Sequence, residues 1–264
     1  MKPTVSVIIV THDRCEEFLA RALDSVLSQD HPPKKIVVVD SGTDEHRIKT
    51  KEYLEGLDAH EIDIRLAGDK IMLAPEARNL GASLCTGDYL AFLDDDDEWF
   101  PEKLSSQLTA ADDLPAVIYS PYIEENGGKP TEFRWAPATY PEILGRNLIG
   151  ATSFPLIRSD VFRGMDGFDP GFEANQEWDL WIRVLRTGSC VYSSTLVGKK
   201  YDNPGLSTDA SARKAGWRAL FSKHREEYRK NRPQHREAAG MFYGDMKNRK
   251  NLTGIISSLI ENIR

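Results

Sequence analysis

Hydrophobic residues in the first hundred positions follow two alternating patterns. Residues 5–10 and 35–40 are β-branched runs, typical of strands buried on both faces. Between them, the apolar residues of CEEFLARALDSVLSQ recur at helical spacing. This order predicts a βαβ unit, and therefore a parallel sheet with a right-handed crossover. Further strands are predicted at 62–66 and 89–94, with a helix near 75–85 between them.

The second half of the chain has a less regular pattern. Residues 116–122 are predicted to form a strand, 124–141 are loop-like, and TSFPLIRSDVF resumes the strand-and-helix pattern. NQEWDLWIRVLRTG has helical spacing, and from residue 210 the chain is basic and mostly helical. We therefore predict an α/β domain over residues 1–205 and a helical C-terminal extension over 206–264.

Composition restricts the class of partner. A chain of 264 residues can bury a large core, and its net charge of −7 gives no basic footprint for nucleic acid. Its three cysteines lack CxxC spacing, which argues against a zinc site or a disulfide framework. The first apolar run is too short for a signal peptide or a membrane span, so a cytoplasmic location is expected.

Polar residues follow three of the predicted strands, as THDR, DSGT and the four aspartates of LDDDD. Ligands of open parallel sheets bind at this edge, and clustered carboxylates suit a divalent cation, which relieves their repulsion. Side chains alternate along a strand, so Asp94 and Asp96 are expected on one side and Asp95 on the other. The alternative is a solvated loop or a helix cap, and we assign the capping role to Asp97.

Phosphate-binding glycine motifs are missing. Neither GxxxxGK[ST] nor GxGxxG occurs after the first strand, so phosphates would be held mainly by metal and side chains. Asp40 could accept a hydrogen bond from a nucleobase imide and Arg78 could contact a diphosphate. Taken alone, each residue fits a structural role equally well.

Four segments, in this order, carry a family resemblance. The chain resembles the family-two inverting glycosyltransferases over about residues 4–210. The segments that carry this resemblance are SVIIVTHDR, VVVDSGTD, EARNLGASLCTGDYLAFLDDDDEWFPEKL and GFDPGFEANQEWDLWIRV. The resemblance implies a GT-A (Rossmann-like) fold with a mostly parallel central sheet flanked by helices. It also implies a nucleotide-binding half, 1–97, and an acceptor half, 98–205.

The resemblance assigns roles to the strand ends. Thr11 and Asp40 would hold the nucleobase, and Arg78 would lie near the donor. Asp94 or Asp95 would contact the ribose, while Asp96 would bind Mn²⁺ or Mg²⁺ directly.

The same resemblance places a general base in QEWDLW. Glu177 falls at the base position, where many relatives have aspartate, and Asp179 is the second candidate. Asp179 is equally consistent with a first-turn acid that interacts with the helix dipole. Trp178 and Trp181 could stack on an acceptor sugar or pack in the core, and packing is favoured.

Two positions depart from the family pattern. Asn203 stands where many relatives have a histidine that completes the metal or diphosphate site, so a third protein ligand for the metal is left open. The second strand ends in DSGT rather than DDGS, which keeps only the first acid. The QxxRW signature of processive synthases is absent.

These features predict a metal-dependent inverting transferase that moves one sugar from a nucleotide-sugar donor, UDP-linked, to a glycan or lipid-linked acceptor. The alternatives are a catalytically silent sugar-nucleotide-binding module and a sugar nucleotidyltransferase, although the glycine-rich loop of the latter is replaced by THDR. The amphipathic segment LTGIISSLIENI would either contact the inner face of the membrane or pack on protein, and packing is favoured.

Overall fold

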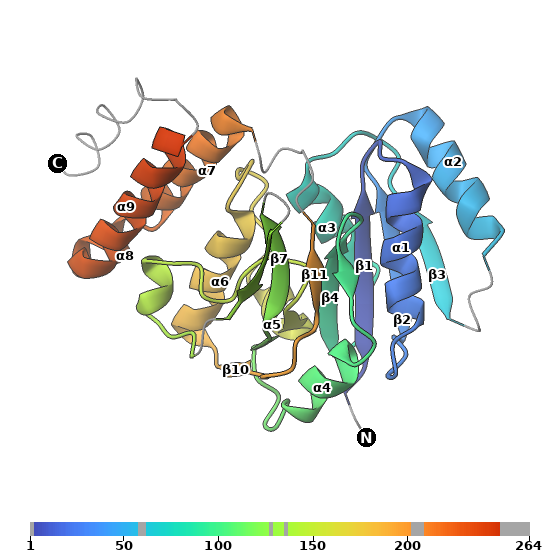
Figure 1. Cartoon of the computed structure of the whole chain (residues 1–264), viewed down its shortest axis with the longest axis horizontal. Helices are drawn as coiled ribbons and strands as arrows, with labels where there is room; N and C mark the ends of the chain where they lie inside the picture. Colours follow the sequence, from blue (N-terminus) through green and yellow to red (C-terminus); the bar gives the residue numbers. More distant parts are fainter. Residues whose placement is uncertain (1–2, 58–61, 127–128, 135–136, 202–208, 249–264) are drawn as a thin grey trace.

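The structure, a computed structural model, describes residues 3–57, 62–126, 129–134, 137–201 and 209–248. Within these ranges, the central sheet has the strand order β10-β6-β9-β4-β1-β2-β3 (Figure 1). Its strands are β1 (Val5–Thr11), β2 (Lys35–Asp40), β3 (Asp63–Ala67), β4 (Tyr89–Asp94), β6 (Val117–Tyr119), β9 (Leu156–Arg158) and β10 (Cys190–Tyr192). Only β9 pairs antiparallel with its neighbours, so the predicted mostly parallel α/β sheet is confirmed.

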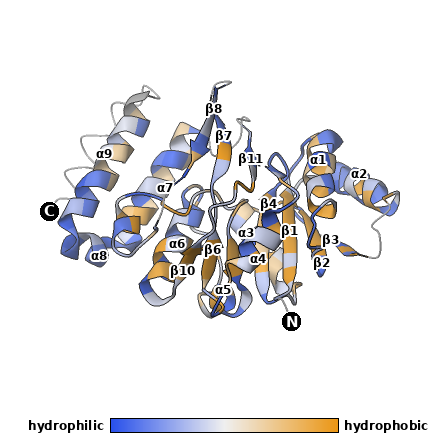
Figure 2. Ribbon diagram, turned by 60° about the horizontal axis from the view of Figure 1, so that its bottom comes forward, coloured by the Kyte–Doolittle hydropathy of each residue, from blue (hydrophilic) through white to orange (hydrophobic). Residues whose placement is uncertain are grey.

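Helices cover both faces of this sheet, and the alternation along β1 explains why. Val7 and Ile9 pack with buried residues of α1 (Glu16–Leu27) and α4 (Lys103–Thr109), whereas Ile8 and Val10 pack with buried residues of α3 (Ala74–Ser83) and α6 (Gln176–Thr187). These strands are hydrophobic along most of their length, as the colouring of Figure 2 shows. Two further helices complete this part: α2 (Asp44–Glu55) lies beside α1, and α5 (Ser159–Gly164) follows β9.

A smaller sheet corrects the prediction of a loop over 124–141. Its order is β5-β11-β7-β8, and β7 and β8 form an antiparallel hairpin in which Tyr122 lies opposite Phe133. The rings of these two residues stack with centroids 4.7 Å apart. Glycines 127 and 128 stand between the two short strand segments, and a pair of glycines in this position is typical of a hairpin turn. The strands are β5 (Glu98–Trp99), β7 (Tyr122–Asn126), β8 (Lys129–Phe133) and β11 (Gly198–Lys200).

The strand predicted at 116–122 is also corrected, because it belongs to two sheets. It splits into β6 and β7 around Ser120 and Pro121. Proline has no N–H to donate to a ladder, so a strand cannot continue unchanged through it. Its carbonyl instead accepts a hydrogen bond of 3.0 Å from the backbone N–H of Val197.

The C-terminal helices α7 (Ala210–Lys223), α8 (Arg225–Lys230) and α9 (Arg232–Asn248) lie at the opposite end of the molecule from α1 and α2 (Figure 1). Buried side chains of α9, among them Phe242 and Met246, belong to the same core cluster as α6. The predicted domain boundary at residue 205 and the segment LTGIISSLIENI lie outside the described residues. None of the described helices has the length and apolar character needed to cross a bilayer.

Candidate active site

The polar ends of β1, β2 and β4 meet at one edge of the central sheet. Thr11 lies opposite Asp40 in the β1–β2 register, and Val10 lies opposite Asp94 in the β1–β4 register. The carbonyl of Thr11 accepts a hydrogen bond of 3.0 Å from the N–H of Ser41, which ties the two turns together. Residues far apart in the sequence therefore converge as the strand pattern predicts.

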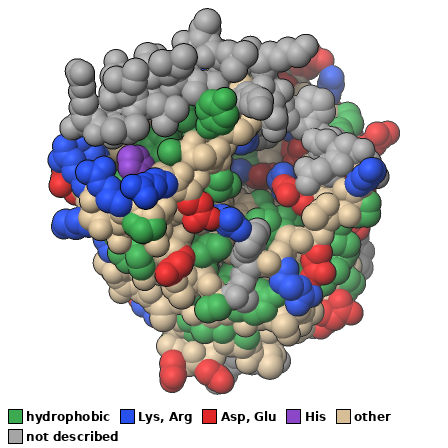
Figure 3. Space-filling model, turned by 60° about the vertical axis from the view of Figure 1, so that its left-hand side comes forward, with side chains coloured by type: hydrophobic (Ala, Val, Ile, Leu, Met, Phe, Trp, Pro, Cys, Tyr) green, Lys and Arg blue, Asp and Glu red, His purple; other side chains and the backbone are tan. Residues whose placement is uncertain are grey.

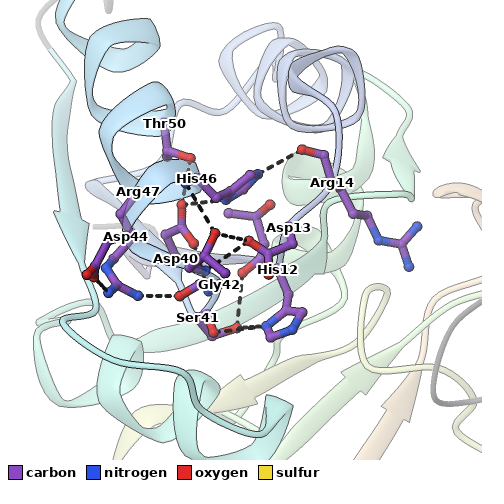
Figure 4. A network of polar contacts seen from close by, with 12 residues as sticks. His12, Asp13, Arg14, Asp40, Ser41, Gly42, Asp44, His46, Arg47 and Thr50 are labelled. Atoms are coloured by element: carbon purple, nitrogen blue, oxygen red, sulfur yellow. Dashed lines mark hydrogen bonds and ion pairs between the residues drawn. The ribbon is translucent and has the colours of Figure 1, made fainter.

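Asp40 is buried and already has partners inside the protein (Figure 4). Its carboxylate accepts hydrogen bonds from the Gly42 N–H at 2.9 Å, the Thr50 hydroxyl at 2.6 Å and His46 Nδ1 at 2.8 Å. His46 Nε2 lies 2.7 Å from the carbonyl of Arg14, so this network joins the turn after β2 to the turn after β1. The expected contact of Asp40 with a nucleobase stays a prediction.

The aspartates that follow β4 have basic partners from two different elements. Asp94 Oδ1 accepts a hydrogen bond from Nη2 of Arg78 on α3. Asp96 Oδ2 lies 2.9 Å from Nη1 of Arg14, and Asp95 Oδ1 lies 3.4 Å from Nε of the same guanidinium. Two arginines thus partly compensate the charge of three carboxylates.

Asp97 does not cap the following helix, so that prediction is wrong. Its side chain is buried and accepts hydrogen bonds from the Ser153 hydroxyl at 2.5 Å and the Tyr201 N–H at 3.3 Å. The two-residue strand β5 intervenes, and α4 begins only at Lys103 with Glu102 as its N-cap residue. Asp97 therefore belongs to the acidic site itself.

Asp94, Asp96 and Asp97 form a cluster suited to a cation. Each offers one carboxylate oxygen, and these three oxygens lie within 4.8 Å of one another. Asp95 instead accepts a hydrogen bond from the hydroxyl of Thr11, so Asp94 and Asp96 share the cluster and Asp95 does not. Strand alternation is not the reason, because β4 ends at Asp94, and Asp95 and Asp96 lie in the turn that follows. Carboxylate oxygens are hard ligands of the kind that Mg²⁺ and Mn²⁺ prefer. The donor set fits either ion.

The electrostatics of this cluster are incompletely balanced. Burial raises the pKa of Asp95 to about 7, although the hydrogen bond from Thr11 and the charge of Arg14 oppose the rise. Burial and then the neighbouring carboxylates also raise the pKa of Asp96, and they raise that of Asp97 well above its usual value. The site favours any added positive charge, whether a proton or a metal cation.

Three side chains at this edge have buried polar atoms without a hydrogen-bond partner in the described structure. One is Arg21, whose Nε has no acceptor although its Nη2 donates to the Asp96 carbonyl at 2.8 Å. Arg78 is 5% exposed, and its Nε and Nη1 have no acceptor. Asp95 is 4% exposed, and its Oδ2 has no donor. Buried polar groups are rarely left unpaired, so these atoms indicate the chemistry of a ligand: acceptors facing Arg78 and donors facing Asp95.

Glu177 lies near this cluster although it comes from a different part of the chain. Asn175 precedes α6 with a left-handed φ of 60°, and Glu177 is half-buried in the first turn. Burial raises the pKa of Glu177, and the charges that act on it include those of Arg78, Asp94 and Arg213. The structure therefore brings the predicted base and the predicted donor residues into one electrostatic environment.

Asp179, the second candidate for the base, is a structural carboxylate. It is fully buried, with its oxygens 2.9 Å from His224 Nε2, 2.9 Å from Arg183 Nε and 3.0 Å from Lys223 Nζ. Burial alone would raise the pKa of Asp179, but the hydrogen bond from His224 and the charges of Arg183 and Lys223 outweigh it and lower the pKa. Because Asp179 is fully buried and paired with three basic side chains, an acceptor cannot reach it.

Both tryptophans of QEWDLW pack in the core, as favoured over stacking on a sugar. Trp178 donates a hydrogen bond from Nε1 to the Ile143 carbonyl at 2.6 Å, and Trp181 donates to the Gly150 carbonyl at 3.0 Å. The ring of Trp178 also meets that of Trp217 edge to face at 5.1 Å. These contacts hold α6 between the sheet and α7.

Several site residues escape sequence analysis. Ser153 gives no sequence signal, because only the fold brings it to Asp97. Arg14 is visible as part of a polar strand end, but its pairing with two aspartates is not. Asn203 lies outside the described residues, so the question of a third metal ligand at that position keeps its status as a prediction.

Comparison with known proteins agrees with this geometry. The family model described as "Glycosyl transferase family 2" matches residues 6–165. Among curated proteins, the amylovoran biosynthesis glycosyltransferase AmsB of Erwinia amylovora is 28% identical over 195 residues, which cover 69% of this chain and 64% of that protein. The chain thus spans about two thirds of the length of this relative.

Solved structures share the GT-A fold. TarS of S. aureus, residues 1–349 in complex with UDP-GlcNAc, has a TM-score of 0.66 and 17% sequence identity, covering 82% of this chain and 65% of that one. The mannosyltransferase PcManGT from Pyrobaculum calidifontis, in complex with GDP-Man and Mn²⁺, has a TM-score of 0.63 and 16% identity, covering 87% of this chain and 65% of that one. The expected fold is confirmed.

Proposed function

The chain belongs to glycosyl transferase family 2 and is a glycosyltransferase, and from this premise we propose a specific reaction. It moves one sugar from a nucleotide-sugar donor, taken to be UDP-linked, to a hydroxyl of a glycan or lipid-linked acceptor, with inversion at the anomeric carbon. The reaction depends on Mn²⁺ or Mg²⁺, and Glu177 acts as general base.

The unpartnered atoms of Arg78 and Asp95 carry the donor part of this proposal. Arg78 Nε and Nη1 need acceptors, which diphosphate oxygens supply, and Asp95 Oδ2 needs a donor, which a ribose hydroxyl supplies. Thr11 and Asp40, on the neighbouring strand ends, would face the base. The nucleotide sugars bound by TarS and PcManGT support the same class of donor.

Asp94, Asp96 and Asp97 would hold the cation, with Asp96 in direct contact. When bound, a divalent cation offsets charge that develops on the leaving diphosphate. The raised pKa values of Asp96 and Asp97 support this assignment, because their repulsion is relieved by a positive charge.

Glu177 would take the proton of the acceptor hydroxyl. As that oxygen forms its bond to the anomeric carbon, the bond from this carbon to the diphosphate oxygen breaks, and the nucleoside diphosphate leaves. The raised pKa of Glu177, caused by burial, makes it a stronger base than an exposed glutamate. Arg78 and Arg213 favour its ionised form. Attack from the side opposite the leaving group gives inversion.

A nucleotide-sugar panel tests the function. The full chain is incubated with UDP- and GDP-linked sugars, with Mn²⁺ or with EDTA, and both melting temperature and released nucleoside diphosphate are measured. The proposal expects one donor to stabilise the protein and to be hydrolysed slowly, in both cases only with metal. Stabilisation without any turnover, even with a range of glycan acceptors, would instead indicate a silent binding module.

We also propose that residues 249–264, which come after α9, make a contact with either a lipid surface or another protein surface. Figure 3 views the molecule from the side of the C-terminal helices, and Lys and Arg side chains gather at the left of this view. Exposed basic residues of α8 and α9 are Arg225, Arg229, Lys230, Arg232 and Arg236. Flotation with anionic liposomes compares the full chain with one that ends at Asn248, the last residue of α9. Equal flotation of both would exclude the segment as the membrane contact.

A further inference from the structure

Arg14 lies at the edge of the sheet where the proposed nucleotide-sugar donor and the proposed metal cation would both bind. It follows β1, is 26% exposed at its side chain, and contacts Asp96 through Nη1 at 2.9 Å and Asp95 through Nε at 3.4 Å. Its guanidinium also lies over the ring of Phe18 at 5.6 Å. Arg14 is therefore held by two carboxylates and an aromatic ring, but its partial exposure leaves it a path out of the cluster.

Asp96 cannot serve two cations equally well. Its carboxylate belongs to the three-acid cluster, and Oδ2 of that carboxylate is the atom that Arg14 contacts. Like charges a few ångströms apart repel each other strongly where they are only partly exposed to water. A divalent cation bound at Asp96 would therefore weaken the hold of Asp96 on Arg14.

Arg78, the other arginine of the cluster, is in a different position. Its Nη2 pairs with Asp94, while Nε and Nη1 have no partner among the described residues, so Arg78 can contact a ligand without releasing the aspartate. Arg14 differs from Arg78, because its two ion-pair contacts within the described residues are both to carboxylates of the acidic turn and its side chain is partly exposed. If a cation takes the place of Arg14 at Asp96, the released Nη1 is available to a phosphate oxygen.

We propose that Arg14 is an exchange residue: it pairs with Asp96 when the site is free and binds a phosphate oxygen of the donor when Asp96 binds the cation. This inference rests on the proposed function, since it requires both a metal and a nucleotide diphosphate at this edge. Arg14 then couples the two ligands. The cation alone has to displace Arg14 from Asp96, and the diphosphate gives the displaced guanidinium a new anionic partner.

Thermodynamic linkage makes the coupling measurable without any turnover. Binding of Mn²⁺ to the full chain is titrated by calorimetry in the absence and in the presence of UDP, and again with GDP. The ratio of the two Mn²⁺ dissociation constants is the coupling factor. For the natural chain we expect Mn²⁺ to bind at least tenfold more tightly with the nucleotide present.

The variant Arg14→Gln removes the competing charge. We expect it to bind Mn²⁺ alone several-fold more tightly than the natural chain, to bind the nucleotide more weakly, and to have a coupling factor reduced about tenfold. Arg14→Lys keeps the charge and should restore part of the coupling. A control is Arg21→Gln, because Arg21 donates to the backbone carbonyl of Asp96 at 2.8 Å and not to its carboxylate; its coupling factor should stay close to that of the natural chain.

The results separate this proposal from the proposed function. If Arg14→Gln binds Mn²⁺ no more tightly and keeps its coupling factor, Arg14 is not an exchange residue, although the enzyme and its metal site stand. An equal loss of coupling in Arg21→Gln would also overturn it, because general charge near the site would then explain the effect. A natural chain that binds neither Mn²⁺ nor a nucleotide would overturn the function itself.

Discussion

Two groups of buried carboxylates in this molecule differ in how their charge is balanced. At the end of β4, Asp95, Asp96 and Asp97 have raised pKa values, and Asp95 keeps a buried oxygen without a partner. At the junction of α6 and α7, the single carboxylate of Asp179 has three basic partners and a lowered pKa. The described residues leave the charge of the first group incompletely balanced, whereas they balance that of the second.

Glu177 and Asp179 show the same difference within one helix turn. Both are acids of QEWDLW, and sequence alone allows either to be the base. Glu177 is half-buried with a raised pKa, and Asp179 is fully buried and bonded to side chains of α6 and α7. Between these two acids of one helix turn, the incomplete compensation of Glu177 favours the functional role and the full compensation of Asp179 favours the structural one.

The largest expected effect is on turnover. Glu177→Gln should lower kcat by about two to four orders of magnitude, the range that general-base catalysis contributes, while nucleotide binding persists. The amide keeps the size of the side chain but cannot accept the proton. Product formation is measured with the donor that the panel identifies. Glu173→Gln is the control, because Glu173 is exposed on the segment before α6; similar rates for the two variants would contradict the role of Glu177.

The next effect is on stability. Asp179→Asn should lower the free energy of unfolding by about 3 kcal/mol, near the lower end of what breaking a buried ion pair costs, because Lys223 keeps Asp169 as a partner at 2.6 Å. Chemical denaturation monitored by tryptophan fluorescence measures it. Asp112→Asn, at an exposed position, is the control. A loss below about 1 kcal/mol would mean that the α6–α7 junction is not held by this network.

Asp97→Asn tests the other group and should act in the opposite direction. The amide oxygen can replace Oδ1 and accept from the Tyr201 N–H, while the NH₂ group replaces Oδ2 and donates to the Ser153 hydroxyl, and the buried charge is removed. Without metal we therefore expect equal or higher stability, by up to about 1 kcal/mol. Stabilisation by Mn²⁺ should be much weaker than in the natural chain. Melting temperatures in EDTA and in Mn²⁺ measure both; a large loss of stability in EDTA would place Asp97 with Asp179 as a structural acid.

Sequence reasoning predicts the part of this molecule that depends on local pattern. The βαβ order follows from buried runs such as β1 and β2, and the meeting of their polar ends at one edge follows from the parallel arrangement of the strands. Contacts between distant segments are not readable in this way. Ser153 reaches Asp97 across 56 positions, and His224 reaches Asp179 across 45. Sequence therefore identifies the candidate acids, but the side chains that pair with each acid in the fold determine which one is structural.

The smallest expected effect is the pH dependence of stability, which should have opposite signs for the two groups. The folded-state pKa of Asp95, about 7, is above its unfolded value, so the folded protein gains a proton first and stability in EDTA should rise as pH falls from 8 to 6. The pKa of Asp179 is lowered, so its contribution to stability is present above the unfolded value near 4 and is lost only as pH falls through the folded value.

Melting temperatures in EDTA from pH 8 to pH 3, with Asp95→Asn and Asp179→Asn beside the natural chain, check both signs. Asp95→Asn should remove the rise between pH 8 and pH 6, and Asp179→Asn should flatten the decline at the acid end. If either substitution leaves its own pH range unchanged, the charge balance assigned to that group is wrong.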